Sequence, residues 1–207
     1  MLPELINNSP KTLRNELYRK SIHLSSVWMP LLIYFAPQKL SLLIFAVLFT
    51  ADLFIEYGCY KKISWTRKLF EGLFIKTLRG REIRKNRFRP SGSVYLLGSA
   101  FLSVWLFPAA IAAIGMSIAL ISDTCAAIFG KIFGTRRIYG TKSLEGTAMF
   151  FLSALYIMTA CNPIFPFAWA GVAACTAATL CELYESILKI DDNLSIPLAV
   201  GFILTFL

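Results

Sequence analysis

Residues 123–146 read DTCAAIFGKIFGTRRIYGTKSLEG, and this stretch decides how the rest of the chain is interpreted. It begins with Asp123 inside an apolar run, passes three glycines and four basic residues, and enters another apolar run at Glu145. Glycines let backbone N–H groups approach phosphates, basic side chains neutralise phosphate charge, and carboxylates hold metal ions. We therefore expect a nucleotide-binding loop over 130–143, at one end of a bundle of apolar helices.

The composition is typical of a membrane protein. Hydrophobic residues make up 57% of the 207-residue chain and charged residues only 16%. The hydrophobic residues occur in long runs, and about 20 consecutive apolar residues are needed for a helix to cross a bilayer. We expect an all-α, polytopic membrane bundle formed by a single domain, 1–207. Its roughly seven transmembrane helices are predicted at 21–36, 39–57, 92–107, 109–129, 144–160, 164–181 and 194–207.

The distribution of basic residues supports this topology. With a cytoplasmic N-terminus, 20 of the 21 Lys and Arg residues fall in inner segments and only Lys39 falls outside them, as the positive-inside rule predicts. These segments are 1–20, 58–91, 130–143 and 182–193. We expect a multi-pass protein of a plasma, inner or endoplasmic reticulum membrane, with its site facing the cytoplasm. The basic segment 58–91 is expected to lie on the membrane surface, and no nucleic-acid partner is expected.

Polar residues near the first two predicted helices form two groups. Glu16, Arg19, Lys20 and His23 have helical spacing where the chain enters the first span. They are candidate catalytic residues, although basic residues there could equally anchor the helix at the interface. Asp52 and Glu56 follow in the second span and would repel one another without a cation or basic partner. They predict either a metal or basic partner, or a structural ion pair between the first two helices.

The third group surrounds the quoted stretch. Asp123 has no basic residue in its own predicted span, so it needs a partner elsewhere or a bound cation. Glu145 begins the next span and could simply favour a helix N-terminus, and residues 191–193 could cap the last helix. Residues 134–143 have five rather than four residues between their glycines and no strand–helix context, so we exclude a P-loop ATPase. The third group of polar residues consists of Asp123, Lys142, Ser143, Glu145, Glu182, Asp191, Asp192 and Asn193.

Taken in order, these residues resemble a known family: the CTP-dependent lipid alcohol kinases, which include dolichol kinase, phytol kinase and CTP-dependent diacylglycerol kinase. The matching pieces are Glu16-x-x-Arg19-Lys20-x-x-His23, Asp52-x-x-x-Glu56, Ser91-Gly92-x-x-Tyr95-x-x-Gly98, Asp123-x-x-Ala126-x-x-x-Gly130-x-x-x-Gly134, Lys142-Ser143-x-Glu145-Gly146 and Asp192-Asn193-x-x-Ile196-Pro197. The chain departs from the family pattern in two ways. Thr147 stands where Ser is frequent, and Arg136-Arg137 and Tyr139 occupy the loop where a further lysine is common.

The resemblance implies transfer of the γ-phosphate of CTP to a membrane-embedded alcohol, either an isoprenoid alcohol or diacylglycerol, with Mg²⁺ as cofactor. Under that interpretation the metal ligands are Asp123, Glu145 and Asp192. The nucleotide-binding residues are Gly130, Gly134, Lys142, Ser143, Glu145, Gly146, Asp192 and Asn193. Arg19 and Lys20 would neutralise the transferring phosphate, and His23 or a carboxylate such as Glu16 or Asp123 would accept the alcohol proton.

Two other functions fit parts of the sequence. A phosphatidate cytidylyltransferase also uses CTP in a membrane bundle, but its usual C-terminal element contains a histidine, and His23 is the only histidine of this chain. A transporter could use intramembrane charges as an ion path, but such a path needs polar groups at several depths, and these lie near one face.

Overall fold

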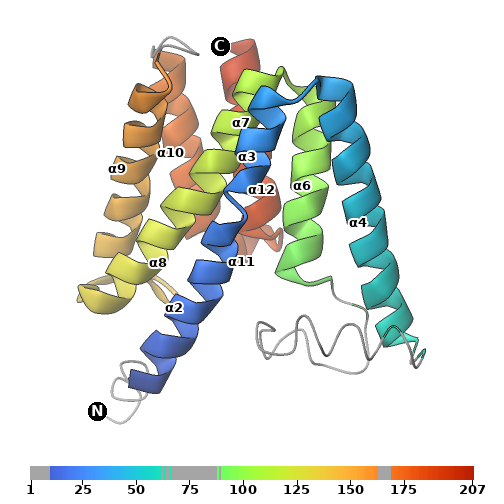
Figure 1. The fold of residues 1–207 in the computed structure, drawn as a ribbon. Coiled ribbons are helices and arrows are strands. Elements are labelled where there is room, and N and C mark those ends of the chain that lie inside the picture. Colours follow the sequence, from blue (N-terminus) through green and yellow to red (C-terminus); the bar gives the residue numbers. More distant parts are fainter. Residues whose placement is uncertain (1–9, 62, 64–65, 67–87, 89, 163–168) are drawn as a thin grey trace.

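The computed structural model describes residues 10–61, 63, 66, 88, 90–162 and 169–207, which are almost entirely helical (Figure 1). The all-α prediction is confirmed. The helices are α2 Pro10–Ser25, α3 Trp28–Phe35, α4 Gln38–Tyr60, α6 Gly92–Leu106, α7 Ala109–Ser117, α8 Asp123–Ile132, α9 Leu144–Ala160, α10 Trp169–Leu183, α11 Glu185–Leu188 and α12 Asp192–Phe206. A π-helical turn, η1 (Ile118–Ser122), joins α7 to α8, and strands β1 (Arg137–Tyr139) and β2 (Lys142–Ser143) form a short antiparallel hairpin.

Every predicted apolar span contains a helix. The structure differs from the prediction in one span and in one loop. The span 21–36 is divided between α2 and α3 by a turn at residues 26–27. Pro30 explains this break, because it has no N–H to donate to the carbonyl of Ser26 four residues earlier. The loop 130–143, predicted without secondary structure, contains the β1–β2 hairpin, and Gly140 supports its turn with a φ of 54°.

Within the part of the chain that the structure describes, two helical stretches are long and apolar enough to cross a membrane: Gln38–Tyr60, with 23 residues, and Ala109–Ile132, with 24. The second is mostly buried inside the bundle, as the core helix of a soluble protein would also be. In contrast, α4 exposes large apolar side chains such as Leu43, Val47 and Phe54. Membrane association rests on these two helices, and a seven-span topology remains a prediction.

The core lies where α12 packs against α6, α7 and α10, while α3 covers α7 and α9 lies along α8 (Figure 1). The largest fully buried side chains come from α3, α4, α7, η1, α9 and α12: Phe45, Phe150, Met29, Ile33, Met116, Ile118, Leu120, Met158 and Ile196. The bundle surface nevertheless remains strongly apolar, because Trp105, Tyr156, Trp169 and Phe206 are each more than 60% exposed.

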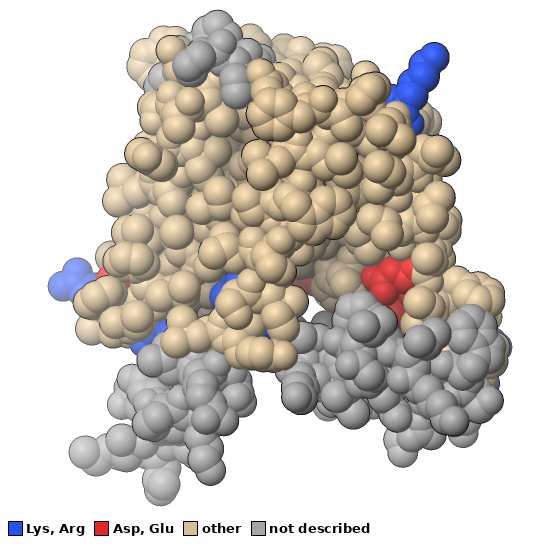
Figure 2. Space-filling view, in the orientation of Figure 1, with Lys and Arg blue, Asp and Glu red and all other residues tan. Residues whose placement is uncertain are grey.

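Charged side chains gather at one end of the bundle. Figure 2 shows a surface without charged side chains over most of the visible face, with acidic and basic side chains along its lower margin and a basic side chain at the upper right. The lower end holds the N-terminal half of α2, the end of α4 and the β1–β2 hairpin (Figure 1). Most of the basic segment 58–91, including most of the run 76–89, lies outside the described residues.

Candidate functional site

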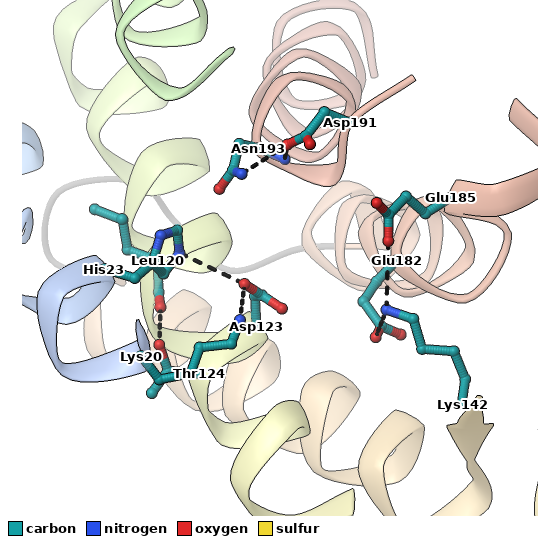
Figure 3. Close-up of polar contacts among 10 residues, drawn as sticks. All are labelled: Lys20, His23, Leu120, Asp123, Thr124, Lys142, Glu182, Glu185, Asp191 and Asn193. Carbon is teal, nitrogen blue, oxygen red and sulfur yellow. Dashed lines mark hydrogen bonds and ion pairs between the residues drawn. The ribbon is translucent and has the colours of Figure 1, made fainter. Parts of the chain in front are cut away.

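The side chains of Lys20 and His23 converge from α2 on Asp123 at the start of α8 (Figure 3). Lys20 donates a hydrogen bond to Asp123 Oδ2 within a buried ion pair, and His23 Nε2 lies 3.5 Å from the same oxygen. Lys20 is only 2% exposed and Asp123 8%. The partner that Asp123 was expected to need is therefore Lys20, supplied by a helix about 100 residues earlier in the sequence. Arg19, next to Lys20 in α2, is half-buried. The side chain of Glu16 lies outside the described residues.

The π-helical turn η1 ends at Ser122, directly before Asp123. One extra residue in such a turn rotates the following side chains relative to a regular α-helix, and π turns are frequent at functional sites. The Thr124 hydroxyl donates to the Leu120 carbonyl at 2.7 Å, which satisfies a carbonyl within the turn (Figure 3). No sequence signal marked this turn, because its residues, Ile-Ala-Leu-Ile-Ser, are ordinary helix residues.

The β1–β2 hairpin positions Lys142, whose ammonium forms an ion pair with Glu182 at the end of α10. Its Nζ also lies 3.9 Å from Glu185 Oε2 (Figure 3). Burial opposes the charged form of Lys142, but the negative charges of Glu182 and Asp192 outweigh burial and raise the pKa of this lysine. Lys142 is therefore a cation at neutral pH. The sequence grouped Lys142 with Glu182 but did not predict the pairing, and it did not indicate Glu185.

The start of α12 forms the acidic side of the site. Asp191 caps the helix by accepting hydrogen bonds from Asn193 N at 3.1 Å and Asn193 Nδ2 at 2.6 Å, so the predicted capping role is confirmed for Asp191. Asp192 has a different environment: it is 3% exposed, and its Oδ1 has no hydrogen-bond partner among the described residues. One carboxylate oxygen each from Glu185, Asp191 and Asp192 lies within 4.8 Å of the others.

Two of the predicted phosphate-binding glycines, Gly130 and Gly146, lie at a close contact between α8 and α9, and Gly134 follows the end of α8. A Cβ at Gly146 would lie 2.9 Å from the Ala126 carbonyl oxygen, and one at Gly134 would lie 2.1 Å from the Gly130 carbonyl oxygen. Ser143 fills the space between them and caps α9 by accepting from Gly146 N at 3.2 Å. These glycines therefore have a packing role, and their contact with phosphate remains a prediction.

Glu145 faces the loop between α8 and β1. Its Oε1 accepts hydrogen bonds from Thr135 N at 3.1 Å, Thr135 Oγ1 at 2.6 Å and Arg136 N at 3.3 Å, which fixes the start of the hairpin. These contacts give Glu145 a structural function. Its proposed role as a metal ligand stays a prediction.

Asp52 and Glu56 face the start of α6. Glu56 accepts hydrogen bonds from the Ser91 hydroxyl and from Ser91 N at 2.9 Å, so it ties α4 to the N-terminal cap of α6. Asp52 is also buried, lies near Ser93, and has one carboxylate oxygen without a hydrogen-bond partner among the described residues. Glu56 thus makes a contact across helices with the start of α6, the third predicted span.

The groups around Asp123 and those around Lys142 form one electrostatic unit, which we call the charged cluster. It consists of Lys20, His23, Asp123, Lys142, Glu182, Glu185 and Asp192. Lys142 interacts with Asp123 and Asp192 as well as with Glu182, and Asp192 also acts on His23. The cluster brings together residues of α2, α8, β2, α10, α11 and α12, so only the folded bundle assembles it.

Comparison with known proteins identifies a relative but no activity. Over 192 residues the chain is 30% identical to the Uncharacterized protein RP860 of Rickettsia prowazekii (strain Madrid E), covering 89% of this chain and 90% of the relative. The chain belongs to the same family as that protein. No family model and no solved structure matches it.

Proposed function

We propose that the protein is a membrane-embedded kinase that transfers the γ-phosphate of CTP to the hydroxyl of a lipid alcohol, with Mg²⁺ as cofactor. The observation that supports this most directly is the charged cluster, in which buried and half-buried cations and carboxylates from six elements meet at one end of an apolar bundle. A charged nucleotide reaching that end from the cytosol and a hydroxyl at the membrane surface would meet there. The multi-pass topology with a cytoplasmic N-terminus is part of the same proposal.

Phosphoryl transfer requires little covalent chemistry from the protein itself. The alcohol oxygen forms a bond to the γ-phosphorus, the bond between that phosphorus and its bridging oxygen breaks, and the alcohol proton passes to a base. Catalysis of this reaction depends mainly on positioning and on neutralising phosphate charge. Lys142 and Lys20 would supply positive charge, and His23 or a carboxylate of the charged cluster would accept the proton. When bound, Mg²⁺ would neutralise phosphate oxygens, and Asp192 is a buried carboxylate suited to hold it.

The decisive experiment is an activity matrix on purified protein. CTP, ATP, GTP and UTP are each combined with an isoprenol, a long polyprenol and diacylglycerol, and the lipid products are separated after reaction with γ-labelled nucleotide. We expect labelled lipid phosphate with CTP and at least one alcohol. Formation of CDP-diacylglycerol from CTP and phosphatidic acid would instead identify a cytidylyltransferase, and no lipid product under any condition would reject the proposal.

Lys142→Ala tests the assignment within the site. Charge-assisted contacts contribute about 1.5–3 kcal/mol, so we expect a loss of roughly ten- to a hundredfold in the rate with limiting CTP. Lys61→Ala is the matched control, because Lys61 is exposed and its ammonium lies over the Tyr57 and Tyr60 rings at 5.6 and 6.0 Å. A severe loss in Lys61→Ala with a silent Lys142→Ala would place the nucleotide elsewhere.

A further inference from the structure

We infer that the divalent cation binds to Glu185, Asp191 and Asp192, between α11 and the start of α12, rather than to Asp123 and Glu145. One oxygen from each of the three lies within 4.8 Å of the others. A cation at their centre could contact all three, and Mg²⁺ prefers a small number of carboxylates together with water and phosphate oxygens. The role of this site in catalysis rests on the proposed function, whereas its position rests on the geometry alone.

Charge pairing within the cluster separates Asp192 from Asp123 and Glu182. Asp123 already has Lys20 as an ion-pair partner, and Glu182 has Lys142. Asp192 is as deeply buried as Glu182, yet its Oδ1 has no hydrogen-bond partner among the described residues. A buried carboxylate oxygen without a donor is costly, and a bound cation would remove that cost.

A second buried oxygen lies beside the same group. Glu182 Oε2 is buried without a hydrogen-bond partner among the described residues, although Glu182 Oε1 accepts from Lys142. In Figure 3 the Glu185 carboxylate is directed toward Lys142 and Glu182. Lys142 is therefore placed beside the proposed cation site, where it and the cation could contact one phosphate chain together.

The backbone holds the three carboxylates in place. Lys189 has a left-handed backbone, with a φ of 56°, and ends α11 at the point where the chain turns toward α12. The hydrogen bonds from Asn193 fix one oxygen of Asp191. Asn193 therefore acts as a positioning residue that presents Asp191.

The test uses the metal alone. Purified full-length protein in detergent micelles is titrated with Mn²⁺, free Mn²⁺ is followed by its electron paramagnetic resonance signal, and Mg²⁺ is added as competitor, all without nucleotide or lipid. We expect saturable binding of about one equivalent, reversed by Mg²⁺, and an affinity about tenfold or more weaker in Asp192→Asn and in Glu185→Gln. Thermal melting in detergent confirms that each variant is folded. Glu185 is half-buried on a short helix, so Glu185→Gln provides the result if Asp192→Asn does not fold.

Glu145→Gln is the matched control, because it neutralises a carboxylate at the same end of the bundle that is held by Thr135 and Arg136. We expect Mn²⁺ binding to be unchanged in this variant. Absence of saturable binding to the wild type, or a loss in Glu145→Gln with none in Glu185→Gln, would overturn the inference. Binding at this site by a protein that phosphorylates no lipid would reject only the proposed function, and kinase activity without this binding pattern would reject only the site.

Discussion

Asp123 shows how one contact changes what a mutation is expected to do. From the sequence alone, Asp123→Asn should abolish turnover and leave the fold intact. In the structure, Asp123 is the ion-pair partner of the buried Lys20, so the substitution also leaves a buried cation without its counter-charge. Removing one partner of a buried pair costs about 3–5 kcal/mol. We expect Asp123→Asn to lower the melting temperature in detergent as well as the activity.

The double variant Lys20→Met/Asp123→Leu is the control for this prediction. It removes both charges and replaces them with apolar side chains of comparable size, so no unpaired charge remains. We expect it to recover most of the lost melting temperature while staying inactive. Equal melting temperatures for wild type and Asp123→Asn would show that the ion pair does not stabilise the fold.

The helices could be predicted from the sequence because long apolar runs and prolines mark them directly. Residues 144–160 were predicted as a helix and form α9 with the same bounds. The pairings between helices could not be predicted in the same way. Lys142 and Glu182 are 40 residues apart, and Lys20 and Asp123 103 apart, so their contacts depend on how the helices pack. Spacing along one helix reveals only neighbours three or four residues away.

The contact between α8 and α9 gives a test of the packing role of the glycines. A methyl group on Gly146 would lie 2.9 Å from the Ala126 carbonyl oxygen and 3.1 Å from Gly130 Cα, so the two helices must separate to admit it. Overpacking of this kind costs about 1–3 kcal/mol. We expect Gly146→Ala to lower the melting temperature of the purified protein.

Gly92→Ala provides the comparison for Gly146→Ala. A Cβ at Gly92, in the first turn of α6, would make only an ordinary contact, 3.5 Å from Asn193 Nδ2. Alanine also has a higher helix propensity than glycine, so we expect the melting temperature to stay the same or rise. If the two substitutions have equal effects, close packing of α8 on α9 is not the reason that Gly146 is needed.

The arrangement of charges along the bundle predicts how the protein sits in a membrane. The β1–β2 hairpin precedes α9 at the lower end in Figure 1, and α9 ends at the upper end, where α4 begins with Lys39 in its first turn. With 17 residues, α9 spans about 26 Å, close to the roughly 30 Å of a bilayer core. Residues 137 and 162 should therefore lie on opposite sides of the membrane, with residue 39 on the side of 162.

Single-cysteine labelling tests this arrangement in bacterial cells, after the five native cysteines are replaced. Because basic loops stay in the cytoplasm, an impermeant maleimide should label a cysteine at 39 or 162 in intact spheroplasts, and one at 137 only after the membrane is permeabilised. Labelling of 137 and 162 from the same side would exclude a transmembrane α9 and with it the seven-span topology. Recovery of the protein in the soluble fraction would exclude membrane insertion altogether. The exposed apolar face of α4 would then have to be covered by another protein surface instead of lipid.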